Sequence, residues 1–241
     1  MMELYLIRHG KTFGNTLGRY IGTTDEELCT EGRESLVQLR NSALQGIRRP
    51  DFVFASPLKR CLQTARILFP EVPVEIRGGF RECDFGEFEN RNYQELSGNP
   101  AYQAWIDSGG KLPFPGGESR QGFEERCRRE FRRTLFDMRC YAEKRRTEPI
   151  WNNGGCTEKR QAAAQNLCLA FIVHGGTIMS ILSAYGDCGS TASDGEEKTD
   201  NFYRWQVKNA EGFRALWDER DKGGIQLYDI SHISPASGDP A

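Results

Sequence analysis

The 241-residue sequence has almost no net charge and no long apolar run. Its formal net charge is −2, from 32 basic and 34 acidic side chains, so its overall charge gives no support for binding to nucleic acid or another polyanion. No run approaches the ~20 consecutive apolar residues that a membrane-spanning helix needs. The first residues lead directly into a strand pattern, so we expect no signal peptide and a cytoplasmic location.

Paired cysteines and paired metal ligands are also missing. The eight cysteines are scattered and form no C-x-x-C pair, and a chain of this length buries a core without disulfides. We therefore expect reduced, mostly structural thiols. No Cys/His spacing typical of a structural zinc site occurs either. Only three histidines are present, which makes the surroundings of each one informative.

Strand patterns alternate with helix patterns along most of the chain. Apolar runs predict strands over residues 4–7, 51–55, 72–76 and 168–173, and apolar periodicity predicts helices over residues 30–44, 56–68 and 177–185. We expect Thr30 and Ser56 to cap the first two helices. Residues 202–207 and 213–217 are typical of a hairpin or of paired edge strands. The alternation predicts an α/β fold with a mainly parallel sheet.

The middle of the chain breaks this alternation. Residues 78–117 are rich in glycine, proline, asparagine and aromatic residues, and so long a loop is uncommon unless it is a lid or a binding wall, so we expect one or two short helices there. Apolar residues then recur at helical spacing from Phe123 to Ala142, and the arginines between them favour a solvated helix face over a nucleic-acid surface. We predict a single domain over residues 1–241, with a cap segment at about 78–117 and a surface excursion at about 144–165.

Two apolar strands end in the same dipeptide, His-Gly. The first runs into Arg8, His9 and Gly10, and the strand at 168–173 runs into His174. Ligands of an open parallel sheet bind outside the carboxyl ends of its strands, so we expect His9 and His174 to emerge at the same edge. A lone histidine is more often structural, but two at matching strand ends favour a functional site.

Three other side chains are expected at this edge. Arg8 adjoins His9, Asn15 follows in a glycine-containing loop, and Arg60 lies at the start of the helix after the second strand. By itself, Arg60 would be typical of an exposed helix residue, and only its position gives it weight. A guanidinium fork matches the oxygens of phosphate, so two arginines, two imidazoles and an amide predict an oxyanion pocket.

Four motifs, LIRHGKT, ASPLKRCLQTA, REC with DFGEF, and VHGGT, follow one another between residue 3 and about residue 185. Together they resemble the histidine phosphatase superfamily, also called the phosphoglycerate mutase-like family. Within it the sequence looks most like the α-ribazole phosphatase branch, which removes a 5′-phosphate late in cobalamin assembly. The resemblance implies a three-layer αβα sandwich with a mainly parallel sheet and one antiparallel edge strand.

The resemblance also implies roles for individual residues. His9 would be the nucleophile that carries the phosphoryl group as phosphohistidine, and Glu82 would protonate the leaving group. Asp84 and Glu87 are rivals to Glu82 by residue type. The phosphoryl oxygens would be held by Arg8, Asn15, Arg60 and His174. His174 is expected to be protonated when phosphate is bound, and no metal or other cofactor is expected because side chains supply the positive charge.

The sequence after Glu82 bears on the substrate. It has few cations and several aromatic residues, namely Tyr93, Tyr102, Trp105 and Phe114. This composition favours a phosphatase for a small phosphomonoester with a bulky, weakly charged leaving group, and α-ribazole 5′-phosphate is the candidate. The alternatives are a cofactor-dependent phosphoglycerate mutase and a catalytically silent protein that binds phosphorylated ligands. We expect no nucleic-acid or membrane partner, and the sequence specifies no oligomeric state.

Overall fold

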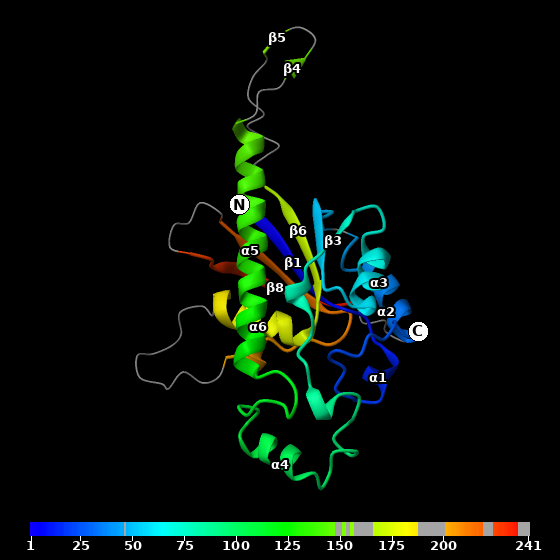
Figure 1. The fold of residues 1–241 in the computed structure, drawn as a ribbon. Coiled ribbons are helices and arrows are strands. Elements are labelled where there is room, and N and C mark those ends of the chain that lie inside the picture. Colours follow the sequence, from blue (N-terminus) through cyan, green and yellow to red (C-terminus); the bar gives the residue numbers. More distant parts are fainter. Residues whose placement is uncertain are drawn as a thin grey trace.

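The computed structural model describes residues 1–45, 47–147, 151–152, 155–156, 166–187, 201–218 and 224–235. A six-stranded sheet with the order β3-β2-β6-β1-β7-β8 lies at its centre (Figure 1). Its strands are β1 (Met2–Arg8), β2 (Phe52–Ala55), β3 (Val74–Ile76), β6 (Cys168–Val173), β7 (Gly212–Trp217) and β8 (Leu227–Ile233). A two-stranded antiparallel sheet consists of β4 (Trp151–Asn152) and β5 (Gly155–Cys156).

Strand direction divides the large sheet. β3, β2, β6 and β1 are parallel, whereas β7 pairs antiparallel with both β1 and β8. The prediction of a mainly parallel sheet with an antiparallel edge is therefore confirmed, and that edge is the pair of β7 and β8. Every residue of β6 is buried, as expected for a parallel strand that is covered on both faces.

Helices cover both faces of this sheet, which gives the expected three layers (Figure 1). On one face lie α2 (Thr30–Asn41) and α3 (Lys59–Leu68), and on the other lie α5 (Arg120–Thr147) and α6 (Gly175–Tyr185). Successive side chains of a strand point to opposite faces, so β6 contributes to two cores. Phe171 packs in the core with residues of α5 and α6, whereas Ile172 packs in the core with residues of α2 and α3.

The other helices are short and lie in the connections. They are α1 (Phe13–Thr16), α4 (Pro100–Asp107) and the 3₁₀ turns η1 (Gly78–Phe80), η2 (Gly86–Phe88) and η3 (Tyr203–Trp205). Three of them, η1, η2 and α4, fall inside the cap segment at 78–117, where short helices are expected. Asn99 caps α4 and Pro100 is its first residue, a combination that favours helix initiation.

Two helix starts differ from the prediction. Cys29 rather than Thr30 caps α2. α3 begins at Lys59, later than predicted, because the hydroxyl of Ser56 contacts a ring nitrogen of His174 at 2.8 Å instead of capping the helix. The Ser56 hydroxyl therefore makes a short tertiary contact with His174, and its local contact with the N–H of Leu58 is longer, at 3.5 Å.

Residues 202–207 do not form the predicted strand. Both edges of β7 are already paired, with β1 and with β8, so no edge remains beside it. The segment contains η3 instead, and its Trp205 and Val207 are buried in the core. The prediction pairs this segment with residues 213–217. In the structure, β8 occupies that position beside β7.

Part of the prediction concerns residues outside the described ranges. The surface excursion expected at 144–165 is described only at the end of α5 and in β4 and β5. No helix of the described residues is long and apolar enough to span a membrane. The six cysteines whose side chains are described are free thiols, and four of them are buried.

Candidate active site

His9 and His174 meet at the carboxyl edge of the sheet. β1 and β6 are neighbours, and Arg8 pairs in register with Val173, so the next residue of each strand leaves the sheet at the same level. The two ring centroids are 5.1 Å apart at an interplanar angle of 67°. His9 is 3% exposed and His174 is 0% exposed. The expected meeting of these two histidines is confirmed.

His9 has a ring nitrogen that is free to react. Its Nδ1 lies 2.7 Å from the carbonyl oxygen of Gly10, and because a carbonyl oxygen only accepts, Nδ1 donates and Nε2 keeps its lone pair. Burial, and then the charges of Arg60 and Arg8, hold the pKa of His9 well below its usual range. The ring is therefore neutral at pH 7, which is the nucleophilic form of an imidazole.

The backbone after His9 lies close to two helices. Gly10 N–H donates to the hydroxyl of Thr64 in α3 at 3.1 Å. A Cβ at Gly10 would lie 2.7 Å from Leu36 Cδ1 and 2.9 Å from the carbonyl oxygen of Gly32, both in α2. Only glycine allows this approach, so the glycine of the Arg-His-Gly motif helps to fix the position of the His9 ring.

His174 directly precedes α6 as its N-cap residue. Its Nε2 lies 2.8 Å from Ser56 Oγ and 3.6 Å from Cys61 Sγ. Burial, followed by the charges of nearby basic groups, lowers the pKa of His174 well below its usual range. A bound phosphate dianion would act in the opposite direction, so protonation of His174 in the phosphate complex stays a prediction.

Arg60 is fully buried and uses most of its donors on the backbone. Its Nη1 donates to Thr24 O at 2.7 Å, and its Nη2 donates to Gly22 O at 2.8 Å and to Ile21 O at 3.2 Å. These bonds fix the loop at 21–24 against the start of α3. Arg60 Nε, in contrast, is buried without a partner among the described residues.

Arg8 shows the same arrangement. Its Nη1 donates to Val207 O at 2.7 Å, and its Nε is a buried donor without a partner in the part of the chain that the structure describes. A buried donor without an acceptor costs about 1–3 kcal/mol. Two such donors, on arginines whose charges act on both His9 and His174, indicate a place for an anion.

Asn15 joins the site through a residue that the sequence analysis missed. Its Oδ1 accepts from the N–H of Thr12 at 3.3 Å and from Asn209 Nδ2 at 3.2 Å. Asn209 Nδ2 also donates to the carbonyl oxygen of His9 at 3.1 Å. No sequence pattern points to Asn209, because it is a single polar residue in a turn 200 positions from His9.

Glu82 approaches this site from the cap segment. A Cβ at Gly176, in the first turn of α6, would lie 2.9 Å from Glu82 Oε1, so the carboxyl group rests against the helix that follows His174. Burial raises the pKa of Glu82, although the N–H of Cys83, which donates to Oε1 at 2.9 Å, and nearby arginine charges oppose the shift. A raised pKa favours the protonated carboxyl group, which is the form that a proton donor requires.

The two rival carboxylates have other surroundings. Asp84 Oδ1 accepts from the N–H of Gly86 at 2.9 Å, which stabilises the turn into η2. Glu87 is exposed. Glu82, which rests against the helix after His174, therefore remains the candidate proton donor.

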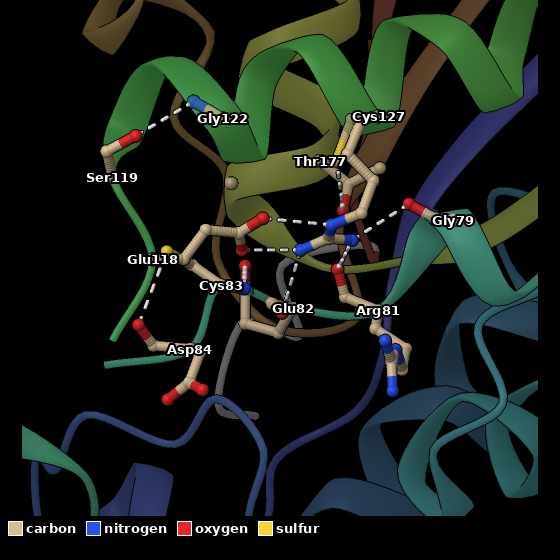
Figure 2. Close-up of polar contacts among 12 residues, drawn as sticks. Gly79, Arg81, Glu82, Cys83, Asp84, Glu118, Ser119, Gly122, Cys127 and Thr177 are labelled. Atoms are coloured by element: carbon tan, nitrogen blue, oxygen red, sulfur yellow. Dashed lines mark hydrogen bonds and ion pairs between the residues drawn. The ribbon is translucent and has the colours of Figure 1, made fainter. Parts of the chain in front are cut away.

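A cleft of about 400 Å³ opens beside Glu82. Figure 2 shows four charged residues of its wall: Arg81, Glu82, Asp84 and Glu118. The other lining residues are Gly22, Thr23, Leu58, Gly116, Gly117 and Arg126. The described lining thus consists of charged residues, glycines, Thr23 and Leu58.

The aromatic residues that the sequence analysis names in the cap segment are not among the described residues that line this cleft. The rings of Tyr102, Trp105 and Phe114 pack on Phe88, with centroids 5.3, 6.3 and 5.8 Å from its own. Tyr93 is exposed. The rings form a separate core, because a segment with little regular structure needs apolar burial of its own.

Comparisons with known proteins identify a family that this chain matches. The model of the histidine phosphatase superfamily (branch 1) matches residues 4–138. The adenosylcobalamin/alpha-ribazole phosphatase of Escherichia coli (strain K12) is 34% identical over 132 residues, which cover 53% of this chain and 64% of that protein. Phosphoserine phosphatase 1 of Hydrogenobacter thermophilus is 28% identical over 123 residues, which cover 49% of this chain and 57% of that protein.

A solved structure shares the fold over most of the chain. The alpha-ribazole phosphatase from Shigella flexneri superimposes with a TM-score of 0.65 and 22% identity, over 90% of this chain and 92% of that one. At this identity the likeness shows the fold alone. The matched region spans only 64% and 57% of the lengths of the two curated relatives. The family model, in contrast, matches more than half of this chain. The chain therefore belongs to the histidine phosphatase superfamily, branch 1.

Proposed function

We propose that this chain is a phosphatase that hydrolyses a small phosphomonoester through a phosphohistidine at His9. The observation that carries the proposal is the neutral His9 ring, with a free Nε2, beside His174 and two arginines that each hold a buried, unpartnered Nε within the described residues. This set supplies a nucleophile and a cradle for a tetrahedral anion. Relatives that are named phosphatases support it.

The reaction has two steps. His9 Nε2 attacks phosphorus and forms a P–N bond while the P–O bond to the leaving group breaks. Glu82 gives its proton to the leaving oxygen, so the first product departs as a neutral alcohol. Water then attacks the phosphohistidine with Glu82 as base, which releases inorganic phosphate and regenerates His9.

The phosphoryl oxygens would be held by Arg8, Asn15, Arg60 and His174. Arg60 offers its Nε and its charge, because its Nη atoms are bound to the loop at 21–24. Asn15 offers its Nδ2 group, because its described side-chain bonds use Oδ1. α6 begins next to His174, and the N-terminal end of a helix interacts favourably with negative charge.

The names of the relatives supply two candidate substrates, α-ribazole 5′-phosphate and phosphoserine. The higher identity to the α-ribazole phosphatase supports the first. The cleft supports the second, because its described lining holds charged side chains of both signs and no aromatic ring. A panel with both esters, 3-phosphoglycerate and p-nitrophenyl phosphate would rank them by kcat/KM.

A mutase is the alternative within the same family, and it needs cations that grip a second acidic group of its substrate. The described lining of the cleft contains two arginines, Arg81 and Arg126. All the N–H donors of Arg126 are in bonds within the protein, which leaves Arg81. The cleft therefore favours hydrolysis, and isomerisation of 3-phosphoglycerate stimulated by 2,3-bisphosphoglycerate would contradict this.

We also infer that the reaction takes place in the cytoplasm on a small phosphorylated molecule. The six cysteines with described side chains are free thiols, a form that a reducing compartment maintains. Cell fractionation with an antibody against the protein tests this location.

The variant His9→Ala tests the proposed activity. The unchanged protein is expected to hydrolyse p-nitrophenyl phosphate in the presence of EDTA, and His9→Ala is expected to lose at least about 10³-fold in kcat/KM. A radiolabelled phosphate ester should leave an acid-labile, alkali-stable label on the unchanged protein only. Urea denaturation checks that the variant is folded.

Unchanged turnover by His9→Ala would refute the proposal. A protein that binds phosphate but turns over no phosphomonoester would instead support the catalytically silent alternative.

A further inference from the structure

Arg126 of α5 binds the segment that carries Glu82 through three backbone carbonyl groups. Its Nη1 donates to Gly79 O and to Arg81 O, both at 2.9 Å, and its Nη2 donates to Glu82 O at 3.4 Å. Figure 2 shows these bonds reaching one guanidinium from the labelled residues. One side chain therefore holds three carbonyl groups of the segment that ends at the candidate proton donor.

Glu118 fixes the same guanidinium. Its Oε1 accepts from Arg126 Nε at 3.0 Å, and its Oε2 accepts from Nη2 at 2.6 Å, which makes a bidentate ion pair. Only 19% of the Arg126 side chain and 21% of the Glu118 side chain are exposed, so solvent screens this pair less than a surface pair. All five N–H donors of Arg126 are thus engaged within the protein.

Hydrogen bonds also hold the backbone on the C-terminal side of Glu82. The N–H of Glu118 donates to Asp84 O at 2.9 Å. The N–H of Cys83 donates to Glu82 Oε1 at 2.9 Å. The position of the carboxyl group therefore depends on the backbone of its own segment, and that backbone is held by the Arg126–Glu118 pair.

We propose that Arg126, held by Glu118, is a positioning residue for Glu82: it fixes the segment at 79–82 so that the Glu82 carboxyl is placed to protonate the leaving group. This inference rests on the proposed function, because it needs Glu82 to act as the proton donor. Arg126 itself offers no N–H donor to a substrate, since all five are engaged within the protein.

Three cations act on the Glu82 carboxyl from three elements: Arg8 from β1, Arg60 from α3 and Arg126 from α5. Burial raises the pKa of Glu82, and each of these charges lowers it. Loss of the Arg126 charge is therefore expected to raise this pKa further. The protonated acid would then persist to higher pH, and the alkaline limb of the pH profile of kcat/KM would move upward.

The dependence on the leaving group separates positioning from simple destabilisation. A general acid matters more for an alkyl phosphate, whose alkoxide leaves poorly, than for p-nitrophenyl phosphate. Arg126→Gln and Glu82→Gln are both expected to lose about 10²-fold in kcat/KM on glycerol 2-phosphate and less than about 10-fold on p-nitrophenyl phosphate. Arg126→Gln is also expected to show the upward shift of the pH profile.

Arg128→Gln is the matched control. Arg128 lies on the same helix and is paired with Glu124 at 2.7 Å, but its other bonds go to Ser180 and Ser183 of α6. We expect small and equal losses on both substrates and no shift of the pH profile. Glu118→Gln keeps the size of its side chain and is expected to show a weaker selective loss, which decides the question if Arg126→Gln does not fold.

Equal losses on both substrates in Arg126→Gln and Glu118→Gln, with a selective loss in Glu82→Gln, would overturn the positioning role and leave the proposed function intact. If Glu82→Gln loses kcat/KM equally on both substrates, Glu82 is not the proton donor, and the inference is overturned. Turnover that survives in His9→Ala would overturn the proposed function itself.

Discussion

At the scale of single residues, burial and the charges of two arginines together favour the neutral form of two histidines. Arg8 and Arg60 each hold a buried Nε without a partner among the described residues, and both act by charge on His9 and His174. Before a substrate binds, these charges favour neutral rings, which suits a nucleophile. Once a phosphoryl group lies between them, the same charges stabilise its oxygens.

Acid is therefore expected to destabilise the fold through His9 and His174. Both rings have a pKa well below the usual 6.5, so below that pH the unfolded chain binds protons that the folded chain does not. The free energy of unfolding then falls as the pH falls, by up to about 1.4 kcal/mol per pH unit for each ring. Glu82 acts in the opposite sense, because its pKa is raised in the folded state and its contribution declines as the pH rises.

Urea unfolding between about pH 7.5 and about pH 5.5 measures this dependence. His9→Asn is expected to give a flatter dependence than the unchanged protein. A slope that His9→Asn leaves unaltered would contradict a neutral, buried His9.

Motifs pointed to the candidate site residues, but they did not point to the partners of those residues. His9, Arg60 and His174 each lie in a short pattern that follows an apolar strand. Ser56 and Asn209 bond to members of this set. Ser56 lies in the same motif as Arg60 and Asn209 lies in none of the four motifs, and in neither case does the sequence identify the bonding partner. Which side chains bond to one another depends on their distances in the folded molecule, and a single sequence does not give those distances.

At the scale of elements, apolar periodicity predicted burial well and pairing less well. β6 and α5 lie where the sequence places them, because a continuous apolar run and a helical stripe each have one way to be buried. Trp205 and Val207 are also buried, but in an irregular segment, since β7 has no free edge. Burial can therefore be predicted from residue type, whereas formation of a strand also requires the free edge of a neighbouring strand.

The cap segment is expected to depend on Phe88 for its stability. Phe88 is fully buried and contacts the rings of Tyr102, Trp105 and Phe114. Phe88→Ala is expected to lower the free energy of unfolding by about 3–5 kcal/mol in urea titrations. Tyr93→Ala, in the same segment but 66% exposed, is the control and should cost less than about 0.5 kcal/mol. A similar small loss for both variants would show that the rings form no core.

At the scale of the whole molecule, the site is assembled from segments that are distant in the chain. The contributions come from the end of β1 (Arg8 and His9), from α3 (Arg60), from the cap segment (Glu82), from the end of β6 (His174) and from the turn before β7 (Asn209). They converge because parallel strands end at one edge of the sheet. Organisation as a single domain stays a prediction.

Inorganic phosphate is therefore expected to stabilise the entire fold. It would give acceptors to the buried Nε atoms of Arg8 and Arg60, and a ligand that binds only the folded state adds about 2.7 kcal/mol at one hundred times its Kd. The Tm should rise with phosphate and should not rise with chloride at equal ionic strength. Arg8→Lys keeps the charge but lacks Nε, and it should show a smaller rise. An equal rise with both salts would contradict an anion site.

The position of β6 has a consequence for synthesis. It lies between β1 and β2 in the sheet, yet it follows both by more than a hundred residues. A nascent chain that has not reached residue 166 thus exposes two strand edges that await the same late partner, a situation that favours slow folding and chaperone contact. Because His174 directly follows β6, the ribosome supplies the strand that joins β1 to β2 and the second histidine of the candidate site at the same moment.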